Sequence, residues 1–186
     1  MATKYFVRPE DFHDIPYLIP DQEENAGNFT AFINAEKTKV LKKIFGLALY
    51  TQLQDAWQAD PEPTSGIWFD LASVSGPLLY EFADVQYEYK GLRSLLVPYI
   101  YSRWCKENMS KLTHSGFVTA VQDENQLISG ADRIVKAYNA FIEELNGGCD
   151  EVENTLYGFL QANLDDYGTD WVITWERWKF MNSFGI

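Results

Sequence analysis

The side chains most suited to acid–base or metal chemistry are few, and their spacing does not group them. His114 precedes Ser115, but sequence neighbours rarely face each other as a nucleophile and its base, and no Gly-x-Ser-x-Gly motif surrounds this serine. His13 lies between Asp11 and Asp14, without the second histidine that a His-Glu-x-x-His zinc motif would supply. Both histidines are therefore predicted to be structural, and no metal site is expected.

Carboxylates are plentiful, and a glycosidase would need two of them across a cleft, one kept protonated in an apolar pocket. Glu81, Asp84, Glu88 and Glu107 are candidates, but nothing in the sequence selects a pair among them. The acidic clusters lack the register of an EF-hand loop, and glycine-rich nucleotide-binding motifs are absent. We therefore predict a protein that is not an enzyme and has no cofactor; a small cell-wall hydrolase is the least favoured alternative.

The composition predicts one domain, spanning residues 1–186, with a large core and an acidic surface. Hydrophobic residues make up 46% of the chain and aromatic residues 16%, so the chain can fold without disulfides or metals. The formal net charge of -12 disfavours binding to nucleic acid, which needs a basic face to neutralise phosphates. The nearest approach to such a face is Lys37, Lys39, Lys42 and Lys43, which we interpret as a solvated helix face.

The spacing of the cysteines and the length of the apolar stretches indicate the cellular compartment in which the protein is found. Cys105 and Cys149 are not spaced as a metal-binding pair or a Cys-x-x-Cys motif. The N-terminal residues lack the apolar run of a signal peptide, and no apolar stretch is long enough to span a membrane. These features predict reduced cysteines, no membrane partner and a protein that stays where it is made.

Hydrophobic periodicity predicts a mainly α, single-domain helical bundle of about five helices with a possible small β-hairpin. Pro9, Pro16 and Pro20 indicate an irregular lead-in over residues 1–28. Gly46 interrupts the first helix, either as a C-cap or as a close packing point within one bent helix. The expected elements are helices over 29–57 and 67–72, a hairpin over 78–89, helices over 89–111 and 123–146, and a final helix to residue 164 opened by a capping-box pair, Asp150 and Glu153.

The densest aromatic sequence is the C-terminal tail, residues 165–186. Its large aromatic side chains are the candidate partner-binding residues: Trp171, Trp175, Trp178, Phe180 and Phe184. Aromatic surface this concentrated must dock somewhere, because an undocked chain end frays and exposed apolar patches usually mark interaction sites. Two alternatives follow: the tail closes over the core of its own domain, or it reaches a partner.

Two stretches of the chain resemble a family of phage proteins. The first, residues 37–53, is a helix, then Gly46, then an apolar-Tyr-x-x-Leu continuation. The second runs over residues 89–101 and continues in Thr-His-Ser-Gly-Phe-Val at 113–118. Together they resemble the helical head-to-tail connector (adaptor) proteins of tailed bacteriophages and prophages, particularly those of gut Bacteroidetes, in outline over residues 30–146.

This resemblance implies a structural virion protein, one subunit of a ring that lies beneath the portal and joins the DNA-filled head to the tail. The implied partners are other copies of the chain and portal or tail proteins, with DNA passing nearby but not bound by sequence. The implied location is the bacterial host cytoplasm during assembly and then the virion. The alternative function is a bacterial or prophage adaptor module that binds one protein through its Trp-rich end.

Overall fold

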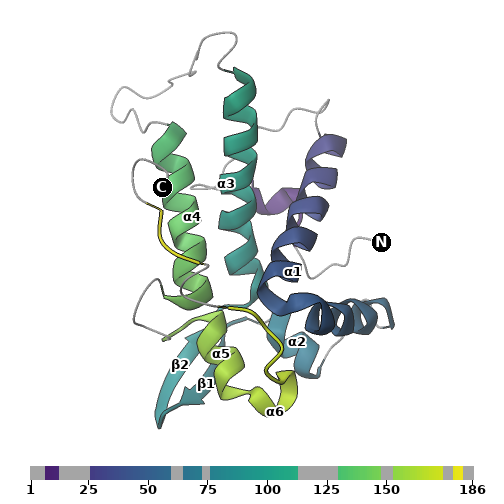
Figure 1. The fold of residues 1–186 in the computed structure, drawn as a ribbon, viewed down its shortest axis with the longest axis vertical. Coiled ribbons are helices and arrows are strands. Elements are labelled where there is room, and N and C mark those ends of the chain that lie inside the picture. The colour runs from purple at the N-terminus through teal and green to yellow at the C-terminus, as the bar shows by residue number, and fades with distance from the viewer. Residues whose placement is uncertain are drawn as a thin grey trace.

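The computed structural model describes residues 7–12, 26–59, 65–72, 76–112, 130–147, 153–173 and 178–181 (Figure 1). Within these ranges the chain forms a mainly α, single-domain fold with a two-stranded antiparallel sheet, which confirms the predicted fold class. The elements in chain order are the 3-10 helix η1 (Pro9–Phe12), α1 (Ala26–Ala59), α2 (Ile67–Ala72), β1 (Leu78–Phe82), β2 (Val85–Tyr89), α3 (Leu92–Leu112), α4 (Gly130–Asn146), α5 (Leu156–Ala162) and α6 (Leu164–Tyr167).

Helices α1, α3 and α4 stand side by side, with α3 between the other two (Figure 1). Residues 95–102 of α3 are all buried, as expected of a helix that is enclosed on every side. The Tyr99 ring lies 4.9 Å from the ring of Phe141 on α4. On the other side, Phe29 of α1 meets Trp104 edge-on, with 4.7 Å between ring centroids. Aromatic contacts therefore join α3 to both neighbours.

The long helix α1 bends at Gly46, where the backbone takes φ 70 and ψ 177. The first part of α1 runs alongside α3, and the second part turns sideways (Figure 1). Leu49, Leu53 and Trp57 continue the buried face beyond the bend, at the four-residue spacing of a helix. A Cβ atom at position 46 would lie 3.0 Å from the backbone oxygen of Asp170. Gly46 thus combines the two predicted roles, a positive φ where the first part ends and close packing at the bend.

The hairpin, α2, α5 and α6 gather at the lower end of the molecule (Figure 1). Tyr89 of β2 stacks on Phe159 of α5 at 4.4 Å, and its hydroxyl donates to the carbonyl of Leu71 in α2 at 2.7 Å. The Tyr167 hydroxyl in α6 donates to the carbonyl of Ile67, also in α2, at 2.5 Å. Two buried phenols therefore tie the hairpin and α6 to α2.

The predicted hairpin and the short helix over 67–72 are confirmed, and several boundaries shift. α1 begins at Ala26, inside the predicted lead-in, most of which lies outside the described residues. α3 begins at Leu92 because Tyr89 belongs to β2 and Gly91 takes φ 91. α4 is described from Gly130, so the earlier part of the predicted helix lies outside the described residues.

The prediction for the final helix was wrong at both ends. α5 begins at Leu156 and is capped by Thr155, whose hydroxyl accepts a hydrogen bond from the backbone N–H of Gly158 at 3.0 Å. Glu153 lies in the preceding turn, and Asp150 lies outside the described residues. Asn163 then separates α5 from α6, so the predicted single helix is two short ones.

Candidate interaction sites

The first described stretch of the aromatic tail crosses the bend of α1. The backbone N–H of Val172 donates to the carbonyl of Ile44 at 2.7 Å, so the tail supplies a donor where Gly46 interrupts the helix. Trp171 is half-buried, with its ring edge-on to Tyr157 at 5.3 Å and its Nε1–H donating to the carbonyl of Gly168 at 2.9 Å. This part of the tail holds the bend in place.

The second described stretch, residues 178–181, lies along α4. Trp178 is 5% exposed, and its indole meets the ring of Phe141 edge-on at 5.5 Å. The Asn146 side-chain amide donates to the carbonyl of Trp178 at 3.1 Å. Asn139 forms two bonds with Met181, donating to its carbonyl at 3.0 Å and accepting from its N–H at 2.7 Å. Two asparagines of α4 thus bind the tail backbone.

The candidate partner-binding residues do not form one exposed aromatic surface among the described residues. Trp171 and Trp178 pack on the protein's own core, whereas Phe180 is 40% exposed. Trp175 and Phe184 lie outside the described residues. For the described part of the tail, the alternative in which it closes over its own domain is the one observed.

Asn139 and Asn146 are site residues that the sequence interpretation missed. They are seven positions apart on α4 and therefore lie on one face, and Asn146 is fully buried there. Asparagine is a poor helix former that hydrogen-bonds readily to backbone groups. Polar residues on the buried face of an amphipathic helix were the available signal for a docked segment.

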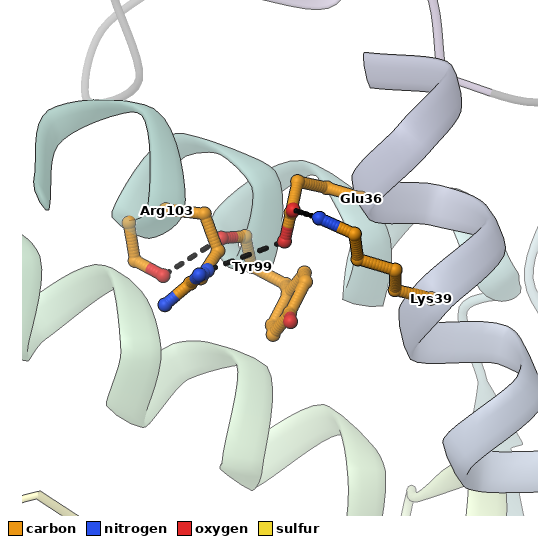
Figure 2. Close-up of polar contacts among 5 residues, drawn as sticks. Glu36, Lys39, Tyr99 and Arg103 are labelled. Carbon is orange, nitrogen blue, oxygen red and sulfur yellow. Dashed lines mark hydrogen bonds and ion pairs between the residues drawn. The ribbon is translucent and has the colours of Figure 1, made fainter. Parts of the chain in front are cut away.

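A charged cluster joins α1 to α3 (Figure 2). The Glu36 side chain is 5% exposed, and its carboxylate lies 2.6 Å from Lys39 Nζ and 3.2 Å from Arg103 Nε. Figure 2 shows Glu36 reaching from α1 toward Arg103 on α3. Burial acts to raise the pKa of Glu36, but the hydrogen bond from Lys39 and the charge of Arg103 bring it below its ordinary value. Burial, and then the Glu36 charge, raise the pKa of Tyr99 to about 12.

Glu36 does not have the properties of the general acid that a glycosidase needs. Glu36 is held ionised by its partners, whereas the general acid of a glycosidase must keep its proton. The four candidates from the sequence are all exposed: Glu81, Asp84, Glu88 and Glu107.

A pocket of about 430 Å³ opens between β1, α2, α5 and α6. Tyr80, Phe159 and Tyr167 contribute buried aromatic rings to its wall, and Asp70, Glu81 and Asp166 contribute carboxylates. The side chains that line it come from two parts of the chain that are far apart in the sequence, α2 with β1 and α5 with α6.

Searches for a metal site and for a membrane-spanning helix give negative results for the described residues. No group of three or more His, Cys, Asp and Glu side chains in these ranges could hold a metal ion, and His13 and His114 lie outside them. None of the described helices has the length and apolar character needed to cross a bilayer. Comparison with protein-family models, with curated proteins and with solved structures finds no match to this chain.

Proposed function

We propose that this chain is a structural virion protein, a head-to-tail connector subunit that assembles into a ring between portal and tail. The observation that carries the proposal is the resemblance of residues 37–53, 89–101 and 113–118 to such connectors. The described residues of both stretches belong to α1, β2 and α3 and contribute to one core. The resemblance therefore concerns the body of the fold. Residues 113–118 lie outside the described residues.

The glycines of these stretches have structural roles that support this interpretation. Gly46 takes φ 70 at the bend of α1, and Gly91 takes φ 91 immediately before α3. Residues with a Cβ atom rarely adopt such angles. The two glycines set the directions of the helices that form the body, as expected of motifs that specify a shape.

The buried polar side chains of the described core support a binding role over a catalytic one. Ser102 donates to the carbonyl of Tyr99 at 2.7 Å, and Asn146 donates to the tail backbone. Thr155 caps α5, and Glu36 joins α1 to α3. Asn146 and Glu36 hold one element against another and Thr155 closes a helix end, whereas the Ser102 hydrogen bond lies within α3.

The charge and the proposed place of action agree. A net charge of -12 suits a ring through which DNA passes without binding, because carboxylates repel phosphates. Assembly would take place in the cytoplasm of the bacterial host, and the finished ring would remain in the virion.

Sedimentation velocity over a range of concentrations, followed by electron microscopy of the largest species, tests the proposal. We expect discrete rings, or a complex with a phage portal protein. An unrelated protein of similar size and acidity, mixed with the same portal, is the control for non-specific charge effects. A chain that stays monomeric at every concentration and does not bind the portal would contradict the proposal.

A further inference from the structure

The pocket between β1, α2, α5 and α6 has the chemistry of a site for cationic side chains. Its rings Tyr80, Phe159 and Tyr167 are at most 7% exposed, and both the Tyr80–Phe159 and Phe159–Tyr167 centroid distances are 5.8 Å. Aromatic rings attract an ammonium or guanidinium group that approaches within about 6 Å. A volume of about 430 Å³ admits side chains from outside.

Within the described part of the chain, the carboxylates of the pocket face no cation. No Lys, Arg or His is among the described residues that line it, and no ion pair within the described ranges involves Asp70, Glu81 or Asp166. Burial, and then the charges of Asp70 and Asp166, raise the pKa of Tyr167, so these two carboxylates act on one phenol. Like charges around one hollow focus a negative potential there.

The chain also carries a matching pair of cations. Lys42 and Lys43 are adjacent and exposed on the first part of α1, and Lys42 Nζ lies 5.2 Å from the centroid of the Tyr50 ring. Four other described cations form ion pairs with carboxylates of their own chain: Lys39, Lys90, Arg93 and Arg103. Within the described ranges, Lys42 and Lys43 are the only two cations that are adjacent in the sequence. Neither Lys42 nor Lys43 is among the residues that line the pocket. The lysine pair and the pocket are therefore separate surfaces.

We propose that Lys42 and Lys43 of one copy bind in the pocket of the next copy, where Asp70, Glu81 and Asp166 receive their ammonium groups. This inference rests on the proposed ring assembly and names the contact that builds it. Because the two surfaces differ, the contact is heterologous, and its repetition generates a ring when the rotation between copies closes.

Two charge variants of the full chain test this contact. D70N/D166N removes two pocket charges, and K42E/K43E reverses the lysine pair. Their matched controls are D84N/D165N, which removes two exposed charges that do not line the pocket, and K106E/K136E, which reverses two other exposed lysines. Circular dichroism and thermal melting establish that every variant is folded, and sedimentation velocity at low ionic strength measures self-association.

We expect self-association of each test variant to weaken by about tenfold or more, while both controls associate like the wild type. An equimolar mixture of the two test variants should form heterodimers and stop there. The intact lysines of one variant meet the intact pocket of the other, and the remaining two surfaces are both disabled.

Two results would overturn the inference while leaving the connector proposal in place. The first is a wild-type chain that self-associates and test variants that associate equally well. The second is a wild-type chain that binds the portal but never self-associates. A mixture of test variants that forms no heterodimer would also overturn the proposed contact.

Discussion

Replacing Gly46 by alanine tests the bend of α1, and Gly168 provides a control with a similar backbone and no close neighbour. Gly46 has φ 70 and ψ 177, and Gly168 has φ 64 and ψ -158, a region that only glycine adopts readily. An added Cβ atom would lie 3.0 Å from the Asp170 oxygen at position 46 and would meet nothing within 4 Å at position 168. The two substitutions therefore separate the cost of the backbone conformation from the cost of close packing.

The conformational cost of alanine in this region is about 1–3 kcal/mol and is common to both variants. Alanine also restricts the unfolded chain, which offsets about 0.4–1 kcal/mol in each case. At position 46 the Asp170 carbonyl must also move, and this movement disturbs the Val172–Ile44 hydrogen bond, a contribution of about 0.5–1.5 kcal/mol. We expect Gly46→Ala to lower the free energy of unfolding by about 0.5–4 kcal/mol and to exceed Gly168→Ala by about 1 kcal/mol.

Urea denaturation of the wild type and both variants, followed by circular dichroism and tryptophan fluorescence, measures these differences. Unchanged m-values would show that the variants differ in stability and not in the surface exposed on unfolding. In a chain of this length, each kcal/mol also lowers the melting temperature by about 2–4 °C. A Gly46→Ala variant as stable as Gly168→Ala would refute the role assigned to the contact with Asp170.

Five further substitutions test the charged cluster, the tail and the α5 cap. Glu36→Gln should lower the free energy of unfolding by about 1–3 kcal/mol at neutral pH. Because the folded pKa of Glu36 lies below the ordinary 4.5, its contribution to the free energy of unfolding is complete above pH 4.5 and is lost as the pH falls through the folded pKa. In urea titrations at decreasing pH, the difference in the free energy of unfolding between wild type and variant should therefore become smaller. Trp178→Ala should destabilise by about 3–5 kcal/mol and Phe180→Ala by less than about 1 kcal/mol; equal losses would show that Trp178 is not a core residue. Thr155→Ala should lower the free energy of unfolding by about 1 kcal/mol, measured in thermal melts, while Thr155→Ser should stay near the wild type. Identical melts for both variants would show that the Thr155 hydroxyl does not cap α5.

The elements with strong periodicity could be predicted from the sequence. The apolar spacing of α1 and α4 marks their buried faces, and alternation through Tyr80 and Tyr87 marks the hairpin. Gly46 could be recognised as an interruption, but the sequence did not contain the position of Asp170, which makes the glycine necessary. Local sequence patterns therefore identified the helices and strands but did not determine the contacts between them.

The elements of the site depend on contacts that local patterns do not encode. Glu36 and Arg103 meet only because α1 packs on α3, and nothing near Glu36 in the sequence indicates this partner. Thr155 caps α5 in place of the predicted acidic pair, since the chain turns at Asn154, where φ is positive. The direction of the tail was equally open, because aromatic residues suit a core and an interface alike.

The hydrogen bond between Val172 and Ile44 joins segments far apart in the sequence, and this separation has a consequence for the order of folding. Helices α3 and α4 follow one another in the chain and can pair through comparatively local contacts, which form early. The tail closes a long loop, whose entropy cost is offset only once the helical body exists to receive it. On dilution from urea, the helical signal should therefore recover before the fluorescence of the buried Trp178.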